Sequence, residues 1–302
     1  MDKVLVIGGP TAVGKTSLGI KLAEQFHGEI ISGDSMQVYK NLNIGTAKVT
    51  KQEMGNISHH LIDVKEMTEE YSAYDFQQAG RKIISEIKAR GKLPIVVGGT
   101  GLYIQTLLYD FQLGTTKTSE KDKLKYEEYL IQHGNKKLWE LLNQKDSYTA
   151  SKIHPNNPQR LIRALTVLDA GGSIWQDERP DPLYDSLIIG LNTDRDLLYK
   201  RINQRVDLMM QQGLEKEAEM VFQLGNIQGA KAIGYKEFFP YFRGESSLEE
   251  AVMSLKQNSR KYAKRQITWF KNRLNTQWYD IILNDDAYMQ MTEQIRKWLN
   301  NE

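Results

Sequence analysis

The sequence has no cysteine among its 302 residues. This excludes disulfide bonds, a thiolate nucleophile and metal sites ligated by sulfur, so any metal must be held by oxygen or imidazole. Long apolar runs are also missing, because the longest aliphatic stretches, at 4–7, 95–97 and 187–189, are far too short to cross a bilayer. The chain enters the first of these runs with no basic leader before it. We therefore expect a soluble cytoplasmic protein that has no membrane partner.

A strong net charge is missing as well. The 40 Lys and Arg residues nearly balance the 38 Asp and Glu residues, and this near-neutral total at first argues against a nucleic-acid partner. The local distribution is different, because residues 256–273 carry +7 and no acid, which leaves −5 for the other 284 residues. Lys256, Arg260 and Lys264 are spaced one helical turn apart, where they repel one another unless an anion faces them. This segment is either a phosphate-binding face or a solvated surface.

Short β-branched runs alternate with segments of helical periodicity, which indicates an α/β fold with a parallel sheet. The predicted strands are 4–7, 29–32, 94–97, 186–191 and 278–283. The predicted helices are 16–26, 74–90, 194–224, 248–274 and 287–299.

The middle of the chain has a different character. From residue 115 to 143 it is rich in lysine and glutamate with helical spacing, and no strand-like segment follows until residue 186. This pattern predicts a helical insertion domain at residues 113–182. The remaining segments, 1–112 and 183–302, are expected to form a P-loop α/β core with C-terminal helices.

A phosphate-binding motif stands directly after the first predicted strand. The sequence Gly9-Pro-Thr-Ala-Val-Gly-Lys-Thr16 is a full match to G-x-x-x-x-G-K-[ST], between a strand and a helix. In this motif backbone N–H groups point inward, lysine adds a mobile charge, and the Thr16 hydroxyl is a candidate ligand for Mg²⁺. The residues predicted to bind the phosphates are Gly9, Pro10, Thr11, Ala12, Val13, Gly14, Lys15 and Thr16.

Two further residues follow the next strands of the predicted sheet. Asp34 stands just past the second strand and Thr100 past the third, so both should lie at the sheet edge where α/β proteins bind ligands. Asp34 is a candidate general base or metal ligand, although an Asx turn explains it as well. The third strand does not end in an acid, as it usually does in hydrolytic NTPases, and this is compatible with a transferase that releases diphosphate.

Several other polar residues have more than one interpretation. The amide of Gln37 has the groups needed to read a base edge. Arg205, one turn beyond Arg201, is a candidate clamp for a diphosphate, but ordinary surface pairing explains these arginines equally well. The neighbouring His59 and His60 do not easily face one metal ion, so we expect one to pack and the other to form a hydrogen bond.

Together these motifs resemble the bacterial tRNA dimethylallyltransferases, the tRNA isopentenyltransferase family. The resemblance extends from residue 3 to about 273, and the combination is far more specific than the P-loop alone. The matching segments, in order, are residues 9–16, 32–39, 43–48, 59–63, 98–103, 159–165, 232–237 and 265–270.

The resemblance implies transfer of a dimethylallyl group from its diphosphate to N6 of adenosine 37 in the tRNA anticodon loop, with Mg²⁺ as cofactor. It implies that Asp34 is the general base and that Lys15, Thr100 and Arg205 complete the catalytic set. We also expect the enzyme to be a monomer. The implied contacts to the anticodon stem-loop are Asp34, Ser35, Met36, Gln37, Thr100, Gln159, Arg160, Leu161, Ile162 and Arg163.

Three other functions remain open at this point. A P-loop kinase for a small molecule or nucleotide shares the phosphate loop and the fold. An isopentenyltransferase acting on free AMP, or a non-catalytic RNA-binding module switched by a nucleotide, also contains such a loop. The basic segment 256–273 and the motif at 159–163 favour a tRNA substrate over the first two.

Overall fold

The computed structural model describes residues 1–111, 113, 119–172, 174, 180–225 and 227–301. These residues form two compact units. The larger unit consists of Met1–Tyr109 with Pro182–Glu302, and the smaller unit is Asp110–Asp181. The smaller unit overlaps the segment 113–182 that was expected to be a helical insertion, and the contact of that insertion with tRNA remains a prediction.

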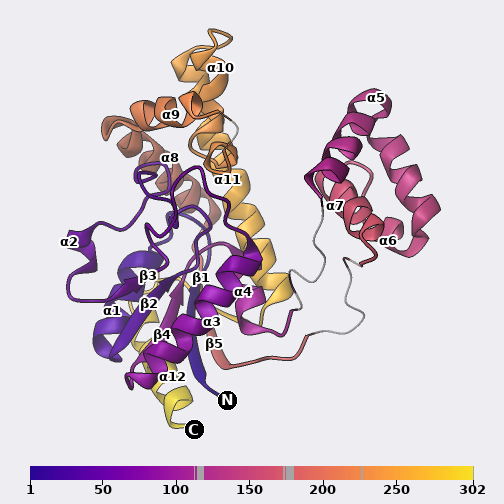
Figure 1. Cartoon of the computed structure of the whole chain (residues 1–302). Coiled ribbons are helices and arrows are strands. Elements are labelled where there is room, and N and C mark those ends of the chain that lie inside the picture. Colours follow the sequence, from indigo (N-terminus) through magenta and orange to yellow (C-terminus); the bar gives the residue numbers. More distant parts are fainter. Residues whose placement is uncertain (112, 114–118, 173, 175–179, 226, 302) are drawn as a thin grey trace. The chain divides into compact units, whose positions relative to one another are not determined.

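The larger unit is built on a six-stranded sheet with the strand order β3-β2-β4-β1-β5-β6. Each pair of neighbouring strands is parallel, and the central strand β1 sets Leu5 opposite Ile95 on one side and Leu187 on the other. This confirms the predicted α/β class (Figure 1). The strands are β1 Lys3–Gly8, β2 Gly28–Ser32, β3 His59–His60, β4 Leu93–Val97, β5 Asp185–Leu191 and β6 Thr276–Tyr279.

Helices cover both faces of this sheet. Val4 and Val6 belong to one apolar cluster and Leu5 and Ile7 to another, because successive strand side chains point to opposite faces. All four are fully buried, which is why β1 reads as an unbroken aliphatic run. The first cluster includes side chains of α3 (Ala73–Ala89), α4 (Gly101–Leu108) and α11 (Leu248–Arg273). The second includes side chains of α1 (Lys15–Gln25), α8 (Arg195–Gln211) and α12 (Ala287–Asn300).

Two predicted elements in the larger unit were wrong. The single helix expected at 194–224 is two helices, since Gly213 adopts a φ of 98°, which an α-helix cannot contain, and α9 starts after it. The last strand ends at Tyr279 rather than at 283, because the Asp280 carboxylate accepts the Ile282 N–H and starts a turn. The remaining elements here are α2 Lys51–Met54, α9 Leu214–Gln223, η1 Gly229–Lys231, η2 Lys236–Phe238 and α10 Phe239–Phe242.

The described residues of the smaller unit contain α5 Glu120–Lys145, which is kinked at Gly134, α6 Ser147–Ser151 and α7 Pro158–Asp169. Its own apolar core includes Tyr126, Leu138 and Leu161. In neither unit does the described part of the chain hold a helix with the length and apolarity needed to span a membrane.

A buried carboxylate joins β2 to its neighbours. Glu29 is 3% exposed. Its Oε2 lies 2.7 Å from both Arg90 Nη2 and His60 Nε2, and its Oε1 lies 3.0 Å from Lys92 Nζ. The hydrogen bonds from Arg90 lower the pKa of Glu29 from its usual 4.5 to about 2. This carboxylate therefore ties the end of α3 and the start of β4 to strands β2 and β3.

Replacing Glu29 with glutamine should lower the free energy of unfolding by about 3 kcal/mol at pH 7, the equivalent of the pKa shift. A lowered native pKa stabilises the fold above pH 4.5, and this contribution is lost as pH falls from 4.5 towards 2. In denaturant titrations at a series of pH values, the free energy of unfolding of Glu29→Gln should therefore lack this part of the fall between pH 4.5 and 2. Glu66→Gln, which breaks the exposed pair with Lys40, is the control and should stay within about 0.5 kcal/mol. Equal losses in both variants would contradict this assignment.

Candidate active site

The phosphate-binding loop connects β1 to α1 through two glycines with positive φ. Gly9 has a φ of 131° and Gly14 a φ of 104°, conformations that side-chain-bearing residues rarely adopt. A Cβ at Gly9 would also lie 2.4 Å from the carbonyl oxygen of Leu191 in β5. The loop therefore curls over the sheet edge and leads into the N-terminus of α1, as the motif predicts.

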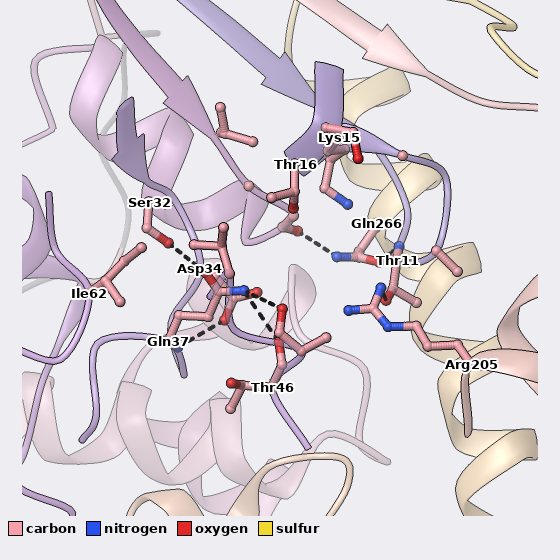
Figure 2. Close-up of a pocket in the computed structure, with 18 of the residues that line it drawn as sticks. Thr11, Lys15, Thr16, Ser32, Asp34, Gln37, Thr46, Ile62, Arg205 and Gln266 are labelled. Atoms are coloured by element: carbon pink, nitrogen blue, oxygen red, sulfur yellow. Dashed lines mark hydrogen bonds between the residues drawn. The ribbon is translucent and has the colours of Figure 1, made fainter. Parts of the chain in front are cut away.

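A cavity of about 440 Å³ opens beside this loop. Figure 2 shows Lys15, Asp34 and Arg205 around it, each from a different element. The side chains and glycines that line it come from the P-loop, from the segments after β2 and β4, from α8 and from α11. The main ones are Thr11, Lys15, Thr16, Asp34, Gln37, Thr46, Gly98, Gly99, Arg201, Arg205, Tyr262 and Gln266.

Three cationic side chains converge on the loop. Lys15 Nζ donates to the Pro10 carbonyl at 2.5 Å, Arg201 Nε to the Ala12 carbonyl at 2.9 Å, and Arg205 Nη1 to Thr11 Oγ1 at 3.2 Å. Burial, followed by the nearby charge of Arg205, lowers the pKa of Lys15 to about 7. Burial also lowers the pKa of Arg205. This concentration of desolvated positive charge suits a bound di- or triphosphate.

The Asp34 carboxylate has a structural role in its own loop. Its Oδ1 accepts the backbone N–H of Met36 at 2.8 Å and of Gln37 at 3.4 Å, which is the Asx turn considered above. Within the described chain, no group donates a hydrogen bond to Oδ2. Asp34 lines the cavity, so one oxygen holds the turn while the other can face a ligand.

A second cavity, of about 310 Å³, shares part of its wall with the first. It shares five lining residues with the first: Thr11, Asp34, Thr46, Arg205 and Tyr262. Its other walls are partly apolar, with Met36, Met209 and Ile233, and its lining also includes the charged residues Lys231, Lys236 and Arg265. Two adjoining cavities with one carboxylate in their shared wall can hold a phosphorylated donor in one and an acceptor in the other.

Thr100 supports the Asp34 turn and does not line either cavity. Its Oγ1 accepts the backbone N–H of Ser35 at 3.1 Å, and its own N–H donates to the Gly33 carbonyl at 3.2 Å. The structure thus brings Thr100 and Asp34 together at the sheet edge, as their positions after neighbouring strands predict. The Thr100 hydroxyl contacts the backbone of Ser35, and Thr100 is not part of either cavity wall.

The sequence reasoning missed the role of Gln266, which joins two loops. Its Oε1 accepts the Thr11 N–H at 2.9 Å, and its Nε2 donates to the Gly99 carbonyl at 3.0 Å. A Cβ at Gly99 would lie 1.9 Å from that nitrogen, so the glycine is required for this approach. The sequence signal for this residue was the segment 265–270, which stands out for its basic charge and its match to the family but does not indicate a contact with the P-loop.

The Gln37 amide is engaged within the protein. Its Oε1 accepts the Ser32 hydroxyl at 3.2 Å, and its Nε2 donates to the carbonyls of Thr46 and Ala47, each at 3.3 Å (Figure 2). In this state the amide fixes the loop that carries Thr46. Reading a base edge, as the sequence suggested, would require it to exchange these partners.

The two adjacent histidines have separate partners. His60 Nε2 lies 2.7 Å from Glu29, and His59 Nδ1 lies 2.9 Å from the Ile57 carbonyl. Among the residues that the structure describes, no group of three or more His, Asp or Glu side chains is arranged to hold a metal ion. The pair belongs to the sheet edge near the Glu29 cluster.

The basic segment of α11 does not form the uniform stripe that its spacing suggested. Lys256 Nζ lies 2.5 Å from Asp207 Oδ1, and Arg260 Nη1 donates to Asn203 Oδ1 at 2.7 Å, so both are tied to α8. Phe270, on the same helix, is fully buried in the core. The basic residues of this segment with exposed side chains are Lys261, Lys264, Arg265, Lys271 and Arg273.

The motif at 159–163 lies on α7 in the smaller unit and has two unlike faces. Leu161 is fully buried and Ile162 is 8% exposed, both within the core of that unit, so their side chains do not face a ligand. Gln159, Arg160 and Arg163 are exposed on the other face. The expected tRNA contacts through the side chains of Leu161 and Ile162 are therefore corrected: these residues hold the helix, and the polar residues beside them remain the candidates.

Comparison with known proteins gives a consistent result. The model of the IPP transferase family matches residues 37–273. A tRNA dimethylallyltransferase of Enterococcus faecalis is 54% identical over 306 aligned residues, covering 100% of this chain and 99% of the relative. One of Bacillus pumilus is 50% identical over 288 residues, covering 92% and 89% of the two chains.

Solved structures agree with these sequence relatives. The tRNA isopentenylpyrophosphate transferase of Bacillus halodurans superposes with a TM-score of 0.76 at 43% identity, covering 100% of this chain and 98% of that one. A eukaryotic dimethylallyltransferase captured acting on tRNA gives a TM-score of 0.83 at 30% identity, covering 100% of this chain and 80% of that one. With a family model that spans most of the sequence and relatives about half identical over nearly their whole length, the chain belongs to the IPP transferase family.

Proposed function

We propose that this enzyme transfers a dimethylallyl group from dimethylallyl diphosphate to N6 of adenosine 37 in the anticodon loop of tRNA and releases diphosphate. The observation that carries the proposal is the position of Asp34, whose carboxylate lines both the P-loop cavity and its neighbour. The names of the sequence relatives support dimethylallyl transfer to tRNA.

The P-loop cavity would hold the diphosphate of the donor. Backbone N–H groups at the start of α1, Lys15 and Arg205 would neutralise its oxygens, and Arg205 would act as the clamp. The Thr16 hydroxyl would hold Mg²⁺, which takes few protein ligands when phosphate oxygens and water complete its shell, and this fits the sparse donor set here. The ion would stabilise negative charge on the departing diphosphate.

The reaction proposed here forms one bond and breaks another. Adenine N6 attacks C1 of the dimethylallyl group, and the bond between C1 and the diphosphate oxygen breaks with its electron pair leaving on that oxygen. Lys15 and Arg205 stabilise this growing charge. The N6 proton passes to Asp34, whose Oδ2 is the oxygen not used by the turn.

The second cavity would receive the adenine. A base must leave its stack to reach a buried carboxylate, and the walls contributed by Met36 and Ile233 offer apolar contact to a ring. Exposed Lys261, Lys264 and Arg265 on α11 would contact tRNA phosphates. Thr100 would support the Asp34 turn, while Ser35, Gln37, Gln159, Arg160 and Arg163 would provide polar contacts to the anticodon stem-loop.

We further propose that the enzyme works as a monomer in the cytoplasm. Its proposed substrate, tRNA, is used by the ribosome in that compartment.

Incubation with dimethylallyl diphosphate, Mg²⁺ and unmodified tRNA, followed by mass analysis of the nucleosides, tests the proposal. Adenosine 37 should gain the mass of one dimethylallyl group in place of one hydrogen. In a parallel reaction with ATP added, consumption of ATP without any such gain would favour a kinase instead. Modification of free AMP but not of tRNA would assign the alternative isopentenyltransferase activity.

Asp34→Asn should keep the turn but remove the general base. The amide oxygen can still accept the Met36 and Gln37 N–H groups, whereas the amide cannot take up the N6 proton. The rate of transfer should fall about 100- to 10,000-fold, the usual contribution of a general base. Binding of donor and of tRNA should change by less than about threefold, measured by titration calorimetry and filter binding. Near-normal turnover in this variant would leave Asp34 with the turn as its only role.

Donor binding should take up protons through Lys15. Its pKa of about 7 leaves the Lys15 side chain largely neutral at pH 8 in the empty site, and a bound diphosphate raises that pKa, so binding should take up about one proton. The affinity should fall by up to about tenfold for each pH unit above 7. Calorimetry in two buffers of different ionisation enthalpy measures this uptake.

Lys15→Met is the matched control for the proton uptake. It should bind the donor about 10- to 100-fold more weakly, because one charge-assisted contact is lost. It should also lose the proton uptake at pH 8. Identical uptake by Lys15→Met and the parent protein would show that another group takes the proton.

A further inference from the structure

Two segments of the sequence that match the family, residues 43–48 and 232–237, meet at one carboxylate. Glu217 in α9 accepts the backbone N–H of Asn43 at 3.0 Å and of Ile44 at 2.9 Å through Oε2. Through Oε1 it accepts the Gly45 N–H at 2.9 Å and the Tyr235 hydroxyl at 2.8 Å. One side chain thus satisfies three consecutive backbone donors of a loop and a tyrosine from another segment.

The packing around this carboxylate is tight. Tyr235 is fully buried, and burial together with the adjacent Glu217 raises the pKa of its hydroxyl, which therefore stays a donor. A Cβ at Gly45 would lie 2.7 Å from the Tyr235 ring. The loop therefore has little freedom to move while the Glu217 contacts are intact.

The same loop leads to the reactive carboxylate by a short series of hydrogen bonds. The carbonyls of Thr46 and Ala47 accept the Gln37 side-chain amide, each at 3.3 Å. The backbone N–H of Gln37 in turn donates to Asp34 Oδ1 at 3.4 Å. Thr46 also lines both cavities, so the loop is a shared wall as well as a support.

We propose that Glu217 is a positioning residue for the transfer reaction, which holds the loop 43–47 and through Gln37 keeps the Asp34 turn in place. It lines neither cavity and acts only through these residues. The inference rests on the proposed function. A carboxylate suits the task because its two oxygens accept four hydrogen bonds at once, and bonds to a charged acceptor are the stronger kind.

Glu217→Gln tests this role, because an amide has one acceptor oxygen and cannot replace both carboxylate oxygens. We expect kcat for dimethylallyl transfer to fall about 10- to 100-fold, since misplacing a base costs rate. The KM for the donor should stay within about threefold, because the P-loop contacts are not touched. Hydrogen exchange at the backbone amides of 43–45 should become faster in the same variant.

Glu215→Gln is the matched control on the same helix. The Glu215 carboxylate also accepts a tyrosine hydroxyl, that of Tyr241 at 3.0 Å, but it holds no backbone of the 43–47 loop. This variant should keep kcat within about twofold and leave the exchange of amides 43–45 unchanged. A loss of kcat in both glutamine variants would mean that α9 stability, and not the loop, is responsible.

Gly45→Ala provides a second test that leaves the Glu217 charge in place. Its added methyl group must push the loop away from the Tyr235 ring, so kcat should fall while donor KM holds. Parental kcat in both Glu217→Gln and Gly45→Ala would overturn the positioning role. A parent protein that modifies no tRNA would instead overturn the proposed function, and the exchange of amides 43–45 would still show whether Glu217 holds the loop.

Discussion

The desolvated positive charge of Lys15 and Arg205 is the constraint on which the rest of the site depends. Burial disfavours both charges, and the charge of Arg205 further disfavours that of Lys15, so the site is organised for an anion that neutralises them. Neighbouring contacts keep these groups and the phosphate loop in place. Gln266 fixes the loop by accepting the Thr11 N–H, and Arg205 donates a hydrogen bond to the Thr11 hydroxyl.

The architecture converts this electrostatic constraint into a site for group transfer. In a parallel sheet, the carboxyl ends of β1, β2 and β4 meet at one edge, which brings the P-loop, Asp34 and Thr100 together. Asp34 lines both cavities, with its Oδ1 used by the turn. A diphosphate donor in one cavity and a purine acceptor in the other can therefore both reach the carboxylate, and the turn fixes its orientation.

The features that sequence reasoning predicted are those set by local chemistry. A P-loop between strand and helix, aliphatic strands buried on both faces, and Asp34 after β2 all follow from short segments. The features that it missed depend on contacts between distant segments. Gln266 reaches Thr11 across 255 positions and Glu217 reaches Asn43 across 174, and no local spacing encodes such pairs. The break at Gly213 was missed because the apolar period continues on both sides of it.

We propose that one carboxylate, that of Asp34, serves a donor in the P-loop cavity and an adenine in the adjoining cavity. The most direct measurement is a crystal structure of the protein with Mg²⁺, an anticodon stem-loop and a donor analogue in which sulfur replaces the bridging oxygen. We expect the diphosphate to lie among the P-loop N–H groups, Lys15 and Arg205, with adenine N6 within hydrogen-bond distance of Asp34 Oδ2. A diphosphate bound outside the P-loop, or an adenine that remains stacked and far from Asp34, would contradict it.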